Sequence, residues 1–309
     1  MREAPKAWHA VCGNDEMSTL VSESRRMAFV HIPKNSGTSI SAAIIEALSP
    51  ETVLDGDGRI TKPRPMTYKL GHLNLKALKQ NFPDVFAKIE SYDTYAVIRD
   101  PRARFVSSAA QYFREHRFHA FSKIKGVKRD KGFIFGLPED VLLEELHSVT
   151  TELKKSHDIL PYELVHFTKQ ATYIEHGGRP VVNRAYALGD LGVLSADLSN
   201  RYGVRFNIAE KRNATEAYRS RRLGQTARQI GRMLRPIMPH SQFKKLRDTT
   251  NRVIKITTDN RRPSAFDHPE VERFVTDYYS RDFELFETVA RDGTVGGNAI
   301  QQGKIHHAN

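Results

Sequence analysis

The feature that most constrains the fold is a short apolar run that ends at a proline and is followed by a loop and a helix. Residues Met27–Ile32 have the composition of a buried strand, and Lys34–Gly37 have that of a turn. Thr38 or Ser39 then caps a helix that continues to Leu48. A strand, a tight loop and a helix in direct succession predict an α/β domain with a parallel sheet.

A second unit of the same kind follows some way along the chain. Tyr95–Ile98 is an apolar strand, and Arg99 follows it directly. Asp100 is placed to cap the next helix, with Pro101 in its first turn. Further expected elements are a helix at Pro138–Leu153, a strand at Ala185–Leu188, a helix at Leu191–Tyr202 closed by Gly203, and one terminal helix at Pro269–Ala290.

The 309 residues show no internal repeat and no clear domain boundary. We therefore expect a flexible lead-in at 1–26, a single domain at 27–292 and a disordered tail at 293–309, which is rich in Gly, Gln and His. The start of the chain is polar and no long apolar run follows, so neither a secretory signal nor a membrane helix is expected. Cys12 is the single cysteine, which fits a reducing compartment, and we expect a cytoplasmic protein.

The positive charge is concentrated in one segment, residues 211–262. This segment holds 15 Lys or Arg and 3 Asp or Glu, and its net charge of +12 equals that of the whole chain. Ser220–Leu234 and Phe243–Ile256 within it have the pattern of basic helices. Such a segment indicates a surface for a polyanionic substrate, a membrane face or nucleic acid, and a solvated helical face is the equal alternative.

The loop after the first strand has the chemistry of an anion site. It places backbone N–H groups and Lys34 at a helix N-terminus, where the helix dipole favours negative charge. Gly37 allows the backbone to approach a phosphate, and Thr38 and Ser39 add hydroxyl donors. The lysine precedes the glycine, so the spacing is not that of a Walker loop. A generic turn between a strand and a helix could contain the same residues.

The loop after the second strand places Arg99 at the carboxyl end of that strand and Ser107 two turns into the following helix. Ligands of open α/β sheets bind at these strand ends, and a guanidinium group suits a phosphate. The alternative is an Arg99 that pairs with a neighbouring carboxylate and a Ser107 that faces solvent.

Taken together, the segments HIPKNSGTS (31–39) and VIRDPRARFVS (97–107) resemble the paired signature of carbohydrate sulfotransferases of the family 2 type. Tyr278–Phe286 is similar to the closing helix of that family, and His166–Gln170 to a segment in its middle. The resemblance implies a P-loop-like three-layer fold with a central, mainly parallel sheet flanked by helices and with helical additions in the C-terminal part. The anchoring helix of the membrane-bound members of the family has no counterpart in this sequence, which favours a bacterial-type soluble enzyme or a shortened chain.

This resemblance implies a role for each residue of the two motifs. Members of the family use 3′-phosphoadenosine 5′-phosphosulfate (PAPS), with 3′-phosphoadenosine 5′-phosphate as the product. Lys34 would contact the phosphosulfate bridge, and Arg99 and Ser107 would bind the 3′-phosphate. The 5′-phosphate would lie in the loop, on Asn35, Ser36, Gly37, Thr38 and Ser39. Asn35-Ser36 stands where the family usually has Thr-Gly, so the loop geometry can differ from that of the family. We expect binding to survive, because the family's contacts at this point are mainly to the backbone.

An alcohol acceptor also needs a base, and a histidine fits because its ordinary pKa lies near neutrality. His72 follows a glycine between the two motifs, as does the histidine that serves as the base in the family. The alternative is a His72 that only bonds to a loop. His31 more simply packs at the end of its strand. His116, His119, His157 and His166 lack metal-ligand spacing, and no metal is expected.

The resemblance thus implies transfer of a sulfuryl group to a hydroxyl of a carbohydrate or glycoconjugate. The positive charge of the segment at 211–262 is compatible with an anionic acceptor. Nucleic acid is not expected as a partner, and peripheral membrane contact could occur through the segment at 211–262. The alternative function is a polyanion- or nucleic-acid-binding protein that uses this segment. That reading explains the charge but leaves both loops unexplained. A kinase with an atypical loop is disfavoured because the Walker spacing is absent.

Overall fold

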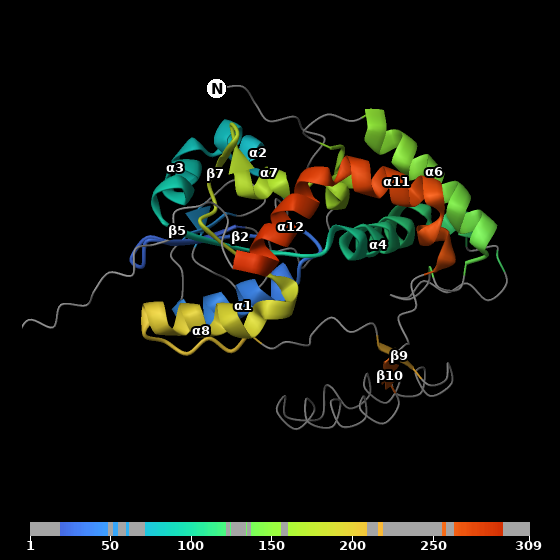
Figure 1. Ribbon diagram of the computed structural model, residues 1–309. Helices are drawn as coiled ribbons and strands as arrows, with labels where there is room; N and C mark the ends of the chain where they lie inside the picture. The colour runs from blue at the N-terminus through green and yellow to red at the C-terminus, as the bar shows by residue number, and fades with distance from the viewer. Residues whose placement is uncertain are drawn as a thin grey trace, which may run out of the picture.

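The structure is a computed structural model. It describes residues 19–48, 52–54, 60–61, 72–121, 124, 134, 137–155, 160–208, 216–218, 255–257 and 263–292. Over these residues the chain forms an α/β fold in which helices lie on both sides of a sheet (Figure 1).

The main sheet has six strands in the order β4-β3-β1-β2-β5-β8. Their bounds are β1 (Leu20–Ser22), β2 (Met27–Val30), β3 (Thr52–Leu54), β4 (Ile60–Thr61), β5 (Asp93–Ile98) and β8 (Arg184–Ala187). Two smaller sheets pair β6 (Glu175–His176) with β7 (Arg179–Pro180) and β9 (Glu216–Tyr218) with β10 (Lys255–Thr257).

The sheet is mixed, and the expectation of a mainly parallel sheet is wrong. β2, β5 and β8 are parallel neighbours, whereas β1 pairs antiparallel with both β2 and β3, and β3 pairs antiparallel with β4. The reason is the connection between β1 and β2. It is a tight turn in which the Arg26 amide donates to the Glu23 carbonyl at 3.1 Å, and two strands joined by so short a turn must run antiparallel.

This hairpin also corrects the expected start of the domain at residue 27. Leu20, Val21 and Ser22 of β1 are each at most 1% exposed and lie in the interior of the sheet. Residues 19–26 therefore belong to the domain and not to a flexible lead-in.

The α-helices are α1 (Gly37–Leu48), α2 (Leu75–Asn81), α3 (Pro83–Ser91), α4 (Pro101–Tyr112), α5 (Phe118–Phe121), α6 (Glu139–Lys155), α7 (Ala171–Ile174), α8 (Leu191–Tyr202), α11 (Pro269–Tyr278) and α12 (Ser280–Asp292). A π-helical turn spans Phe113–Arg117, and 3₁₀ turns span Tyr162–Phe167, Leu188–Asp190 and Ser264–Asp267.

Alternate residues along the strands pack on opposite faces of the sheet. Phe29 and Tyr95 pack with α1 and α8 on one face, whereas Val30 and Ala96 pack with α2, α3, α7 and α12 on the other. Because side chains alternate across a strand, an apolar run such as Met-Ala-Phe-Val supplies both cores at once. A third, aromatic-rich core joins α4, α6 and α11 beside the sheet (Figure 1).

Several local expectations are confirmed. Asp100 caps α4 by accepting from the Ala103 amide at 2.8 Å, with Pro101 in the first turn. The helix at Leu191–Tyr202 has the expected bounds, and Gly203 ends it with a left-handed φ of 67°. One cap was misplaced: α1 begins at Gly37, ahead of Thr38 and Ser39.

The single terminal helix expected at Pro269–Ala290 is in fact two helices, α11 and α12. The chain leaves the helical conformation at Tyr279 (φ −104°, ψ 21°), whose buried hydroxyl donates to the Phe167 carbonyl at 2.8 Å. The break lets α11 pack on α6 while α12 packs on the sheet.

Most of the basic segment at 211–262 and all of the tail at 293–309 lie outside the described residues. Of the basic segment only β9 and β10 are described, as an antiparallel pair, so Lys255 and Ile256 form a strand and not the end of a helix. Within the described part of the chain, no helix has both the length and the apolar character needed to cross a bilayer.

Candidate functional site

The two loops singled out in the sequence lie next to each other. They follow β2 and β5, which are parallel neighbours, so both loops leave the sheet at the same edge. Arg99 Nη1 donates a hydrogen bond to the Lys34 carbonyl oxygen at 3.3 Å. The fold therefore brings Lys34 and Arg99 together although they are 65 positions apart in the sequence.

The backbone of the first loop has an uncommon shape. Lys34 and Ser36 have positive φ angles of 70° and 58°, whereas Asn35 between them does not. Positive φ is rare for residues other than glycine, and such residues gather at ligand-binding loops. Alternation of this kind turns successive N–H groups toward one side and forms a concavity for an anion.

Lys34 is held against α4. Its ammonium group donates to the side-chain oxygen of Gln111 in a short hydrogen bond. Ser107 lies one turn before Gln111 on the same helical face and is half-buried. Ser107 is thus on the side of α4 that faces the loop, while its neighbour Ser108 is fully buried and donates to the His166 carbonyl at 2.8 Å.

Asn35 has a structural role in the loop. Its side chain is 1% exposed, and its amide donates to the Val97 carbonyl at 2.8 Å and to the Gln170 side-chain oxygen at 2.7 Å. Only the backbone of Asn35 is therefore placed to meet a ligand. Ser36 and Ser39 are half-buried at the loop, and the side chain of Thr38 lies outside the described residues.

Gln170, which was not singled out in the sequence, joins the two loops. Its side-chain oxygen accepts from Asn35 and from the Arg99 amide at 3.0 Å, and its side-chain nitrogen donates to the Arg99 carbonyl at 2.9 Å. Asp282 in turn accepts from the backbone amides of Gln170 and Ala171, both at 2.8 Å. The resemblance of 166–170 and 278–286 to family segments pointed to these regions, but no local pattern indicated that they meet.

Asp282 and Arg104 are both buried beneath the site, each 1% exposed. Burial raises the pKa of the Asp282 carboxyl, while Arg104 and the two backbone amides act in the opposite direction. Arg104 donates to the carbonyls of Pro33 and His166, both at 3.1 Å. This guanidinium group therefore ties the start of the first loop to the segment that leads to Gln170.

The electrostatics at Arg99 favour an anionic ligand. Burial, and then the like charge of Arg104, lower the pKa of the Arg99 guanidinium, and the nearby Asp100 only partly opposes them. Among the residues that the structure describes, no carboxylate forms an ion pair with Arg99. A half-buried guanidinium that donates to a backbone carbonyl and lies near Lys34 would be stabilised by a phosphate.

Three imidazole rings form a row beside the loop. The ring of His72 lies 6.0 Å from that of His31 and 4.9 Å from that of His166, measured between ring centroids. The backbone carbonyl of His72 accepts from the buried Tyr173 hydroxyl at 2.9 Å. The predicted base is therefore held beside the loop through its main chain, and both nitrogens of its ring are buried.

The glycine at position 37 is required for a reason that the sequence did not show. An added Cβ would lie 2.6 Å from Cε1 of the buried His31 ring.

We expect Gly37→Ala to displace that ring and to lower the free energy of unfolding by about 1–3 kcal/mol, as overpacking does. Urea denaturation would measure the loss. Gly189→Ala is the matched control, because a Cβ there meets no atom within 4 Å and the change should stay within about 0.5 kcal/mol. Equal stability of the two variants would contradict the steric argument.

One group among the described residues has metal-ligating side chains within reach of one another: His147, His268 and Glu270. None of the residues predicted for the cofactor site belongs to it. Comparison of the chain with protein-family models, with curated proteins and with solved structures gives no match.

Proposed function

We propose that this chain is a sulfotransferase with a P-loop-like fold, which moves the sulfuryl group of PAPS to a hydroxyl of a carbohydrate or glycoconjugate. One observation carries the proposal: the left-handed loop at Lys34 and the half-buried Arg99 lie in direct contact at the carboxyl edge of two parallel strands. A nucleotide with phosphates at both its 5′ and 3′ positions needs two adjacent anion sites of this kind.

In this proposal the backbone N–H groups of Ser36, Gly37 and Thr38 and the Ser39 hydroxyl hold the 5′-phosphate, while the Ser39 N–H donates to the Ser36 carbonyl at 3.0 Å. Arg99 and Ser107 bind the 3′-phosphate, Arg99 through its planar fork of donors. Lys34 exchanges its bond to Gln111 for one to the bridging oxygen of the phosphosulfate. The side chains of Gln170 and Asn35 position the two loops relative to each other without touching the nucleotide.

The transfer is an in-line displacement at sulfur. The acceptor oxygen forms a bond to sulfur while the bond from sulfur to the 5′-phosphate oxygen breaks, and the acceptor proton passes to His72. Negative charge grows on the leaving phosphate, where Lys34 and the loop amides stabilise it. Binding of PAPS at this site therefore orients the sulfuryl group for attack and compensates the charge of the leaving phosphate, much as in phosphoryl transfer.

The acceptor class and the compartment belong to the same proposal. A carbohydrate hydroxyl follows from the resemblance of the two motifs, and the excess of positive charge at 211–262 favours an anionic glycan or a peripheral membrane contact. Cys12 as the single cysteine favours the cytoplasm.

The decisive test is calorimetric titration with 3′-phosphoadenosine 5′-phosphate, with ATP as the comparison ligand. We expect one-to-one binding that is much tighter than that of ATP, which lacks the 3′-phosphate. Arg99→Ala should weaken binding roughly 10- to 100-fold, since a hydrogen bond to a charged group contributes about 1.5–3 kcal/mol.

Arg102→Ala is the matched control for Arg99→Ala. It removes the same charge three positions later, but Arg102 pairs with Glu272 at 3.1 Å and lies over the Phe283 ring, away from the loop. Affinity for the nucleotide should therefore be unchanged. No binding by the folded protein, together with heparin binding that falls steeply as salt rises, would overturn the proposal in favour of a polyanion-binding protein.

A further inference from the structure

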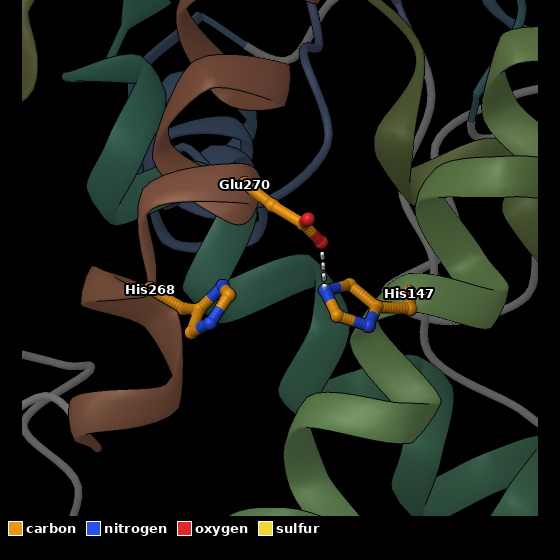
Figure 2. A group of neighbouring side chains, drawn as sticks. All are labelled: His147, His268 and Glu270. Atoms are coloured by element: carbon orange, nitrogen blue, oxygen red, sulfur yellow. Dashed lines mark ion pairs between the residues drawn. The ribbon is translucent and has the colours of Figure 1, made fainter.

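Two histidines and a glutamate that are far apart in the sequence meet where α6 and α11 pack together (Figure 2). His147 lies in α6, His268 is the residue before α11, and Glu270 lies in the first turn of α11. Their ligand atoms all lie within 4.8 Å of one another, and His147 Nε2 is 3.0 Å from Glu270 Oε2.

His268 contributes a polar atom that the surrounding described residues do not satisfy. Its Nδ1 is buried and has no hydrogen-bond partner among them. Its ring lies 5.7 Å from that of His147 in an edge-on arrangement, and Figure 2 shows both rings beside the Glu270 carboxylate. A buried imidazole nitrogen without a partner is costly, and a cation bound to it removes that cost.

The helices beneath the cluster hold it firmly. Leu146 and Val149 of α6 and Val271 and Phe274 of α11 belong to one buried core on either side of the ligands. The backbones are therefore fixed, while the ligand side chains keep some freedom because His147 is 41% and Glu270 67% exposed. Solvent can reach the group, so an ion has a route of entry.

We propose that His147, His268 and Glu270 form a binding site for a divalent transition-metal cation of the Zn²⁺ class. Two neutral imidazoles and one carboxylate are a donor set that Zn²⁺ accepts, with ligand distances of about 2.0–2.2 Å. Ligands at that distance in tetrahedral geometry are about 3.3 Å apart. The pair at 3.0 Å already meets this, and the other separations, at most 4.8 Å, can shorten by rotation of the partly exposed His147 and Glu270 side chains.

The Glu270 carboxylate is what makes the electrostatic potential at this site favourable for a cation. The N-terminus of α11 carries partial positive charge, which opposes a metal ion, and Glu270 offsets it. His147 and Glu270 also line a cavity of about 690 Å³ whose wall includes Lys154, Lys169 and Arg273. A three-ligand ion leaves a coordination position for solvent or for an anion held by these cations.

The test is a titration of chelator-treated, metal-free protein with Zn²⁺ by calorimetry and with Co²⁺ by visible absorption. We expect the wild-type chain to bind one Zn²⁺ more than His268→Ala, and to give a cobalt absorption band that His268→Ala lacks. Glu270→Gln should weaken this site at least on the order of 10-fold, and its exposed side chain makes loss of folding no concern. Zn²⁺ should also raise the Tm of the wild type more than that of either variant.

His116→Ala is the control, because His116 is exposed, lies in the π-helical turn and is not one of the three clustered ligands. It should bind Zn²⁺ like the wild type. Any other histidine of the chain contributes equally to all variants, so the difference between them reports this site alone. Equal stoichiometry and affinity in the wild type, His268→Ala and Glu270→Gln would overturn the proposal, and circular dichroism would confirm that each variant is folded.

Discussion

Arg104→Leu is expected to lower the free energy of unfolding by about 3 kcal/mol or more. The guanidinium is 1% exposed and donates to the Pro33 and His166 carbonyls. Leucine fills much of the volume but removes the guanidinium donor from the Pro33 carbonyl and leaves the His166 carbonyl with Ser108 as its remaining side-chain donor. It also removes the positive charge that acts on the buried Asp282 carboxyl. Loss of one partner from a buried charged network costs about 3–5 kcal/mol, well above the cost of a neutral hydrogen bond.

Urea denaturation followed by circular dichroism would measure this change. Arg104→Lys should retain part of the stability, because it keeps the charge but cannot span both carbonyls. Arg117→Leu is the control: Arg117 is 43% exposed and pairs with Glu145 at 2.7 Å, so its loss should cost less than about 1 kcal/mol. A loss in the free energy of unfolding for Arg104→Leu as small as that for Arg117→Leu would contradict this argument. It would mean that the buried guanidinium does not hold the loop against the His166 segment.

The second large effect is expected on turnover. His72→Ala should slow sulfuryl transfer by about 10²–10⁴-fold, the usual contribution of a positioned general base. Nucleotide affinity should change little, because the anion contacts belong to the loop and to Arg99. The variant should also fold, because Tyr173 anchors position 72 through the backbone carbonyl, which alanine keeps.

Transfer of radioactive sulfate from labelled PAPS to a panel of undersulfated glycosaminoglycans would provide the measurement. His176→Ala is the matched control, since His176 lies in β6 and packs on Phe86 with ring centroids 5.2 Å apart. It should retain full activity. Substantial activity of His72→Ala, with nucleotide affinity preserved, would move the base elsewhere, and His31 and His166 in the same row would be the next candidates.

Several expectations that rest on local interactions are met, although α1 begins at Gly37, ahead of the expected cap. The strand, loop and helix from Met27 to Leu48, the Asp100 cap and the Gly203 stop all depend on residues within one or two turns of each other. The meeting of the Lys34 loop with Arg99 was also foreseeable, because parallel strands in an α/β sheet present their following loops at one edge.

Other features depend on contacts between distant segments. The hairpin that adds β1 makes the sheet mixed, and the turn at Tyr279 divides the last helix in two. Gln170 and Asp282, which position both loops, lie more than 70 residues beyond Arg99. Their side chains follow no local periodicity, so only packing could bring them to the site.

The sequence by itself thus determined the α/β character and the two loops, because period, turn chemistry and capping act between neighbours. Tertiary structure alone decided that Asn35 faces inward, that Gly37 makes room for His31, and that His147 meets His268 and Glu270. These contacts arise when helices and loops close over a shared core, and the free energy that selects them comes from burial, which no single segment of the chain can supply.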